Sequence, residues 1–322
     1  MTTLITGGTG FLGSEIARLL LSGGEARVAL FDLNPSAARL GDLAGRVDVI
    51  RGDLAEAKDV DAAVAESSPD IIYHLGGMLS APSDADHGAA FRANAVGTFN
   101  VLEAARLHGV ARVLYASTIN TYGYDLPEDR VDDYTLQRPA MFYGATKLFG
   151  EHMGRFYRRK FGMDFRGIRY PAIVGPGVST PGISQYASRA IEESAKGNPY
   201  TIFVEPGTRV PIIYIREAAG AMVNLAEAPR ERIETVVYLL GGTTPVPSAR
   251  DLVDSITEHV PEARLDFQPD PEIQAVHNRR RALSSIYDGN ARREWGWKSE
   301  YGLGRIVSEM VQEIRRRDDY SA

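Results

Sequence analysis

The sequence predicts an α/β fold in which a doubly wound parallel sheet is followed by a smaller C-terminal lobe. Short apolar, β-rich runs alternate with amphipathic stretches of helical length through the first half of the chain. A glycine cluster directly follows the first apolar run, between a predicted strand and a predicted helix. The regular alternation ends at 171–177, a loop-forming run rich in proline and glycine.

The elements of the first half follow in the order expected of parallel strands joined by crossover helices. Strands are predicted for 3–6, 27–32, 47–52, 71–75, 112–116 and 165–170. Helices are predicted between them for 13–22, 59–66, 91–109 and 145–161. This order with short links indicates the doubly wound, Rossmann-like arrangement, which binds its ligands at the carboxyl ends of the strands.

The second half of the chain is divided between the sheet and a second lobe. It contains predicted strands at 212–215 and 236–240 and predicted helices at 218–226, 251–259 and 303–317. In the last of these, Ile306, Met310 and Ile314 recur at helical spacing, so we expect an amphipathic helix docked on the body. We therefore expect residues 1–170 to form a cofactor-binding Rossmann domain. Residues 171–322 mainly form a substrate-binding lobe, with segments around 212–240 returning to the Rossmann sheet.

Composition narrows the kind of partner and site. With 322 residues, 44% of them hydrophobic, the chain can bury a large core. A formal net charge of −6 gives no electrostatic reason to expect nucleic acid, so a small-molecule substrate is favoured. The absence of cysteine excludes disulfides and Cys-based metal sites. No metal is expected, because His74 ends a strand without Asp or His partners at metal-ligand spacing.

The N-terminal segment lacks the basic and long apolar regions of a signal peptide. No window holds the uninterrupted apolar run that a membrane span requires. We therefore expect a cytoplasmic protein without a membrane partner.

The glycine cluster predicts a dinucleotide site. Gly7, Gly10 and Gly13 lie between the first strand and the first helix, where a pyrophosphate can approach the backbone at the helix N-terminus. Glycine-rich turns are common, so the assignment to a dinucleotide site depends on the neighbouring strand, helix and acidic residue. Asp32 ends the second strand, where a carboxylate accepts both ribose hydroxyls of NAD and repels the 2′-phosphate of NADP. NAD is therefore the expected cofactor.

Asp53 follows the third predicted strand. There it can accept from the adenine amino group, or it can serve as the N-cap of the following helix, and the sequence does not separate the two.

Tyr143 and Lys147 predict a catalytic pair. They are four residues apart on a predicted helix, so that their side chains share one face. A nearby ammonium stabilises a tyrosinate, which would lower the pKa of Tyr143 toward that of a working general base. Lysine is scarce in this chain, at five of the 36 basic residues, so a lysine one turn after this tyrosine is less expected by chance.

Two hydroxyl residues, Ser117 and Thr118, follow the fifth predicted strand and so lie at the carboxyl edge of the sheet. A hydroxyl there can orient a substrate alcohol toward Tyr143. The alternative is that these side chains cap their own loop.

Together, the 6–13 turn, Asp32, Asp53, Ser117-Thr118 and the Tyr143/Lys147 pair resemble the extended short-chain dehydrogenase/reductase family, within the NAD-dependent epimerase/dehydratase superfamily. The resemblance spans essentially the whole chain. It implies NAD as cofactor and a homodimer formed through helices 91–109 and 145–161. It also implies a set of cofactor contacts: Gly7, Gly10, Phe11, Leu12, Asp32, Asp53, Leu54, Leu75, Asn94, Lys147 and Tyr170.

Within this family, five segments resemble the short-chain L-threonine 3-dehydrogenases: 74–81, 160–166, 169–171, 207–211 and 295–298. That branch implies that Ser80 and Thr118 contact the amino acid, that Tyr143 is the base and that Ser184 approaches the carboxylate. In the nucleotide-sugar branch an asparagine normally stands at Pro171 and an Arg-Asp pair at 210–211, so a UDP-sugar would lose two phosphate contacts here.

Three functions follow as hypotheses. The first is NAD-dependent oxidation of L-threonine or a similar small β-hydroxy acid. The second is epimerisation or dehydration of a nucleotide-linked sugar with tightly held NAD. The third is a non-catalytic NAD-binding regulator, since a fold does not determine function.

Overall fold

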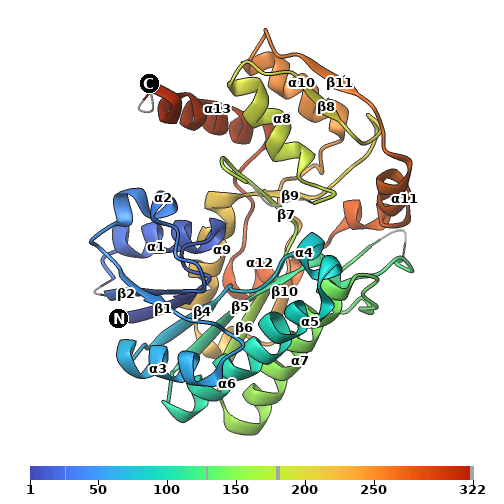
Figure 1. The fold of residues 1–322 in the computed structure, drawn as a ribbon. Coiled ribbons are helices and arrows are strands. Elements are labelled where there is room, and N and C mark those ends of the chain that lie inside the picture. Colours follow the sequence, from blue (N-terminus) through green and yellow to red (C-terminus); the bar gives the residue numbers. More distant parts are fainter. Residues whose placement is uncertain (26, 128–129, 179–181, 320–322) are drawn as a thin grey trace.

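The computed structural model describes residues 1–25, 27–127, 130–178 and 182–319 (Figure 1). Its centre is a seven-stranded sheet with the order β10-β6-β5-β4-β1-β2-β3, in which every neighbouring pair is parallel. The strands are β1 (Thr2–Thr6), β2 (Arg27–Asp32), β3 (Asp48–Arg51), β4 (Ile71–His74), β5 (Arg112–Thr118), β6 (Asp164–Tyr170) and β10 (Val237–Leu239). The predicted α/β class and doubly wound parallel sheet are confirmed.

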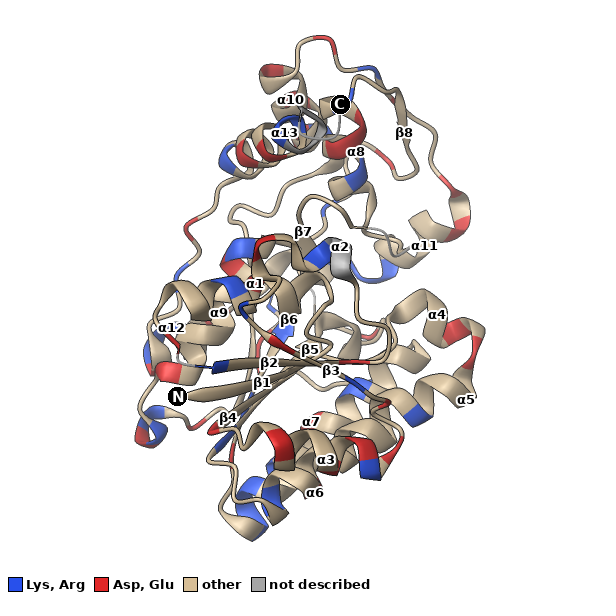
Figure 2. Cartoon of the chain, turned by 60° about the vertical axis from the view of Figure 1, so that its left-hand side comes forward, with Lys and Arg blue, Asp and Glu red and all other residues tan. Residues whose placement is uncertain are grey.

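Helices cover both faces of this sheet (Figure 1). On one face lie α1 (Phe11–Ser22) and α9 (Ile215–Glu227), and on the other lie α3 (Ala57–Ser67), α6 (Gly97–Leu107) and α7 (Phe142–Phe161). Successive strand residues point to opposite faces, so Leu30 packs with α1 and α9 while Phe31 packs with α3 and α6. Because both faces are covered, the strands are mainly uncharged, as the tan colour in Figure 2 shows.

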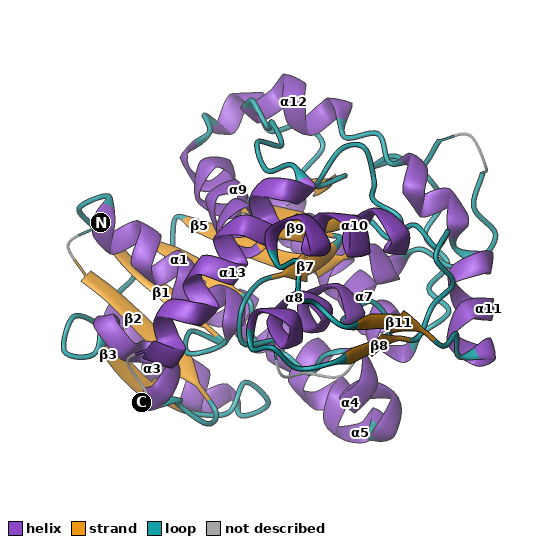
Figure 3. Ribbon diagram, turned by 90° about the horizontal axis from the view of Figure 1, so that it is seen from above, coloured by secondary structure: helices purple, strands orange, loops and turns teal. Residues whose placement is uncertain are grey.

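The C-terminal lobe has its own apolar core. Helices α8 (Tyr186–Ala195), α10 (Ala249–His259) and α13 (Leu303–Asp319) pack together in it; they lie above the sheet in Figure 1 and in front of it in Figure 3. Ile306, Met310 and Ile314 are buried there, as their spacing predicts. Strands β8 (Tyr200–Ile202) and β11 (Leu265–Phe267) form a small parallel pair beside these helices.

The segment 212–240 returns to the main sheet only in part. Helix α9 covers one face of the sheet and β10 pairs with β6, but β9 (Ile212–Tyr214) pairs with β7 (Ala172–Val174) in a separate two-stranded sheet. The expectation that 212–215 joins the Rossmann sheet is therefore corrected. The chain leaves β6 at Pro171, which has no N–H for a strand ladder, and the next residue, Ala172, donates to Pro211 O instead.

The predicted helix 91–109 consists of two parts. Residues Phe91–Val96 form a π-helical segment, and α6 follows directly. Short helices that periodicity did not indicate complete the fold: α2 (Ala37–Leu40), α4 (Ser80–Ala85), α5 (His87–Ala90), α11 (Pro271–Arg279) and α12 (Gly289–Trp295). Within the described ranges, no helix has the length and apolar character needed to cross a membrane.

Candidate active site

The turn between β1 and α1 is built so that only glycine fits. A Cβ on Gly7, whose φ is +65°, would lie 2.8 Å from Gly76 Cα, and one on Gly13 would lie 2.4 Å from Gly7 O. Helix α1 begins without a side-chain cap, and its first hydrogen bond runs from Ser14 N to Gly10 O. The N–H groups of Phe11 and Leu12 therefore have no acceptor in the described part of the chain, and this uncapped terminus fits a pyrophosphate.

Asp32 is held in place at the end of β2. Its Oδ2 accepts from Thr9 N at 3.2 Å and Thr9 Oγ1 at 2.8 Å, and its Oδ1 accepts from Asn34 N at 3.2 Å. The residue is partly exposed, so the carboxylate keeps lone pairs for further donors. Arg51 stands opposite Asp32 in the β2–β3 register and donates to Leu33 O. A fixed carboxylate with free acceptor capacity fits a ribose diol.

Asp53 does not cap a helix. Its Oδ1 accepts from Ala55 N at 2.8 Å, and its own N–H donates to Asp59. The N-cap of α3 is Glu56, so of the two possibilities left open by the sequence the capping role is not observed.

Tyr143 and Lys147 lie in the first two turns of α7, and both are buried. Burial lowers the pKa of Lys147 to about 8, while the charge of Glu151 opposes this shift. The Lys147 ammonium lies 4.6 Å from the ring centre of Tyr115.

The expected low pKa of Tyr143 is not observed. Burial raises the pKa of this phenol well above its ordinary value, because the ring is removed from water.

Ser117 and Thr118 end β5 with different partners. Ser117 Oγ donates to Glu151 Oε1, and Glu151 forms a buried ion pair with Arg169 at 2.8 Å. Thr118 Oγ1 accepts from Asn120 N at 3.2 Å, which caps the short helix that follows. Ser117 is thus directed toward the ion pair, and Thr118 makes the local capping contact that was the alternative to a substrate role.

His74 has a structural role, as the sequence indicated. Its Nδ1 lies 2.7 Å from Thr6 Oγ1 and its Nε2 lies 2.9 Å from Thr98 Oγ1. Burial and the charge of Lys147 lower the pKa of His74 to about 3, so the ring is neutral. Its two hydrogen bonds tie β4 to β1 and α6.

Asn94, in the π-helical segment, holds the loop that follows β4. Its Oδ1 accepts from Met78 N at 2.7 Å, and its Nδ2 donates to Met78 O and to Thr146 Oγ1 at 3.0 Å. The π-helical segment thereby connects this loop to the turn of α7 that carries Tyr143. Such segments are frequent at functional sites.

The other expected cofactor contacts are Leu75, Leu54 and Tyr170, near the carboxyl edge of the sheet. Leu75 lies beside the glycine turn and its N–H donates to Thr6 O. Leu54 packs so closely on the backbone that a Cβ on Gly76 would lie 2.7 Å from its Cδ1. Tyr170 OH donates to Ala218 O at 2.8 Å inside the core, so this hydroxyl connects β6 to α9.

The expected substrate residues come from different elements. Ser80 is the first residue of α4, Ser184 lies just before α8, and both are partly exposed. Within the ranges that the structure describes, neither serine side chain forms a hydrogen bond with Tyr143. Residues 180 and 181, in the segment before Ser184, lie outside the described residues.

Sequence reasoning missed Arg280, which links the C-terminal lobe to this edge. Its guanidinium donates to Asn120 Oδ1 at 2.8 Å and Ile119 O at 3.0 Å, directly after Thr118. Its Nε is buried and has no hydrogen-bond partner in the described part of the chain, and burial lowers the pKa of Arg280 to about 10. Arg280 is the middle of three consecutive arginines, and nothing in that run distinguishes it.

Comparison with known proteins gives a consistent result. A model of the NAD dependent epimerase/dehydratase family matches residues 3–241. The mitochondrial L-threonine 3-dehydrogenase of Bos taurus is 32% identical over 311 residues, covering 96% of this chain and 81% of the bovine protein.

Two solved structures are similar over nearly the whole chain. The holo form of the L-threonine dehydrogenase from Cupriavidus necator has a TM-score of 0.87 and 28% identity, covering 98% of this chain and 100% of that one. The UDP-glucose 4-epimerase of Thermus thermophilus in complex with NAD has a TM-score of 0.82 and 25% identity, with 98% and 99% covered.

Proposed function

The chain belongs to the NAD-dependent epimerase/dehydratase family, and from this premise we propose that it oxidises the hydroxyl of L-threonine or a similar small β-hydroxy acid. It is an enzyme, and NAD is its cofactor. The observation that supports a threonine-like substrate is the 32% identity to a threonine 3-dehydrogenase across 96% of the chain. The placement of Tyr143 and Lys147 at the carboxyl edge of the sheet supports it.

The residues of the glycine turn fit this cofactor. The Phe11 and Leu12 amides would bind the pyrophosphate, and the Asp32 carboxylate would bind the ribose diol. When bound, NAD supplies the hydride acceptor for the carbon that bears the hydroxyl.

Tyr143 would accept the proton of the substrate hydroxyl. Its pKa is raised by burial, so the phenolate needs nearby positive charge. Lys147, with a pKa of about 8, is mostly a cation at neutral pH and lies one helical turn away. The free protein would therefore hold Tyr143 as a phenol, and the Lys147 cation would stabilise the phenolate as the proton is transferred.

Substrate binding is assigned to three hydroxyls. Thr118, at the end of β5, and Ser80, at the start of α4, would hold the amino acid, and Ser184 would approach its carboxylate. Ser117 would act indirectly, because it donates to Glu151. For threonine the product is 2-amino-3-ketobutyrate. It forms when the hydroxyl oxygen loses its proton and the carbon that bears this oxygen loses a hydride.

The test is NADH formation from L-threonine, followed by absorbance at 340 nm. Tyr143→Phe should lower kcat by about 10²–10⁴-fold, the typical contribution of a general base, while NAD binding measured by calorimetry stays within twofold. Ser80→Ala and Thr118→Ala should raise KM for threonine. If Tyr143→Phe keeps more than a tenth of the wild-type rate, Tyr143 is not the base.

A nucleotide-sugar epimerase is the second candidate, favoured by the likeness to the NAD-bound UDP-glucose 4-epimerase. Pro171 and the buried Val210 oppose it, since neither side chain can donate to a diphosphate. An epimerase would retain NAD through gel filtration and convert a UDP-sugar without accumulating NADH. The non-catalytic regulator is set aside, because the chain is an enzyme.

We also propose a homodimer. The π-helical segment, α6 and α7 expose large apolar side chains that a second copy could cover. These are Phe91, Phe99, Leu107, Phe149, Phe156 and Phe161. Sedimentation equilibrium should give twice the chain mass, and Phe149→Glu with Phe156→Glu should give the monomer.

A further inference from the structure

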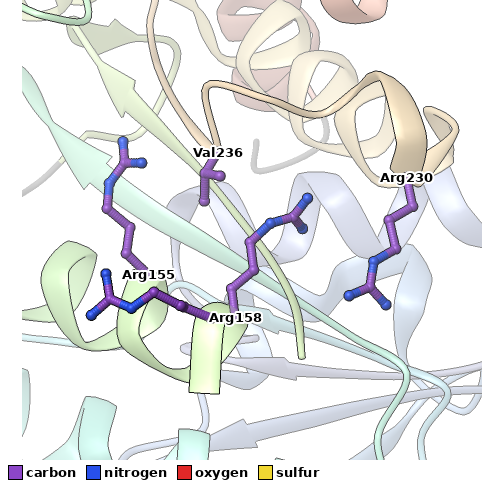
Figure 4. A pocket seen from close by; sticks show the side chains of 5 residues that line it. Arg155, Arg158, Arg230 and Val236 are labelled. Atoms are coloured by element: carbon purple, nitrogen blue, oxygen red, sulfur yellow. The ribbon is translucent and has the colours of Figure 1, made fainter. Parts of the chain in front are cut away.

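A pocket rich in arginine lies at the amino ends of the strands, the edge opposite Thr118. Its volume is about 430 Å³, and it is lined by Arg155, Arg158 and Arg159 of α7, Arg230 after α9 and Val236 before β10. Figure 4 shows Arg155 and Arg158 extending from α7 on either side of Val236, with Arg230 facing them from the neighbouring segment. Four positive charges thus border one cavity remote from the glycine turn.

The acidic groups here do not balance these charges. Arg158 Nη1 lies 3.0 Å from Asp164 Oδ1, but Asp164 also pairs with Arg112 at 2.8 Å and Arg166 at 2.7 Å. A single carboxylate therefore serves three guanidinium groups. Arg230 donates to Gly162 O at 2.6 Å, a neutral acceptor, and forms no ion pair with a described residue.

Arg155 and Arg159 make no hydrogen bond or ion pair with any described residue. Arg155 is partly buried, and its pKa is lowered by burial and by the charge of Arg169, while the charges of Glu151 and Asp133 oppose this shift. The two nearby carboxylates have other partners: Glu151 pairs with Arg169, and Asp133 accepts from Leu239 N and Asn290. Arg155 has thus lost part of its hydration without gaining a hydrogen-bond acceptor among the described residues, and a bound anion would supply one.

The pocket wall has an unusual backbone. Val236 has φ +70°, which is rare for a β-branched residue, and Val237 N donates to Thr235 O across it in a γ-turn. Glu294 holds this turn by accepting from Glu234 N, Thr235 N and Thr235 Oγ1. Strained residues persist where the surroundings over-determine them, and they concentrate at ligand sites.

We propose that this pocket binds a small phosphate-bearing anion, such as pyrophosphate or a phosphate monoester. The planar guanidinium fork matches two phosphate oxygens, and a phosphate group carries close to two charges at neutral pH. Arg155 and Arg159, which have no polar partner among the described residues, can neutralise such an anion together with the partly engaged Arg158 and Arg230. A monocarboxylate would leave most of the charge uncompensated. The site is independent of the proposed function.

The experiment is calorimetric titration of pyrophosphate into the NAD-saturated enzyme at constant ionic strength. Bound NAD fills the glycine turn, so pyrophosphate cannot bind there, and the arginine variants report whether it binds at the pocket. We expect one site per chain, with Arg155→Gln/Arg159→Gln lowering the affinity at least tenfold. Arg189→Gln, an exposed arginine of α8, is the matched control and should leave it unchanged. Glucose 6-phosphate in the same titration shows whether a monoester suffices.

An equal affinity of the wild type and the double variant for pyrophosphate would overturn the proposal. The proposal would also be overturned if titration with sodium chloride of equal ionic strength gave the same heats. If the double variant fails to fold, by its thermal midpoint, Arg159→Gln replaces it, because that side chain is exposed. This single variant should lower the affinity at least threefold, and an unchanged value would equally overturn the site.

Discussion

Replacing Glu151 with Gln should destabilise the protein strongly. Glu151 is 1% exposed and Arg169 is 2% exposed, and the two form paired hydrogen bonds at 3.0 Å and 2.8 Å. Ser117 Oγ and Gln137 Nε2 also donate to this carboxylate. An amide at this position would leave the buried guanidinium without its counter-charge and direct an N–H toward other donors.

Breaking a buried ion pair from one side costs about 3–5 kcal/mol. Unfolding entropy of about 2.1 cal/mol/K per residue over 322 residues converts this to a fall of about 4–7 °C in Tm. The matched control is Asp48→Asn, which removes the carboxylate from an exposed pair with Arg27 and should cost at most about 1 kcal/mol.

The assay is thermal unfolding followed by circular dichroism at one scan rate and at pH 7. A Glu151→Gln midpoint within about 1.5 °C of wild type, or a loss no larger than that of Asp48→Asn, would refute the claim that burial makes this pair important.

Three further predictions concern the cofactor turn and the catalytic lysine. Asp32→Ala should weaken NAD binding. It should also permit the use of NADP, since Arg51 stands opposite in the register and could meet the 2′-phosphate. An unchanged ratio of kcat/KM for the two cofactors would contradict this. Gly13→Ala should lower both NAD affinity and Tm, because the added Cβ meets Gly7 O at 2.4 Å, whereas Gly220→Ala in α9 meets nothing within 4 Å and should be neutral or stabilising. The pKa of Lys147 is about 8 in the folded protein against an ordinary 10.5, so the unfolded chain binds more protons between these values and stability should rise with pH there. Lys147→Met should remove that part of the rise, as unfolding midpoints at pH 7.5 and 9.5 would show, and an equal rise in both proteins would count against a depressed pKa.

The fold was largely predictable because local signals and packing agree. The alternation of β-rich runs and helices, the glycine turn and the spacing of Ile306, Met310 and Ile314 each reflect burial against one neighbour, and burial patterns are visible in sequence. Strand 212–214 was misplaced because an apolar run does not say which strand it pairs with. Its partner is β7, which Pro171 separates from the end of β6.

The candidate site was less predictable, because its properties depend on side-chain partners distant in sequence. The Tyr143–Lys147 spacing predicted a shared helix face but not the burial that raises the pKa of Tyr143. Ser117 could not be assigned to Glu151 from a separation of 34 residues. Arg280 reaches Asn120 across 160 residues, and no local pattern records such a contact.

The late position of α9 and β10 in the chain has a consequence for synthesis. These elements complete one face and one edge of the main sheet, yet about 70 residues separate the end of β6 from the end of β10. At a translation rate of about 5–20 residues per second, the nascent sheet would wait about 4–14 s with apolar side chains such as Ile168 uncovered. During that interval the growing chain would be a substrate for chaperones that hold exposed apolar segments.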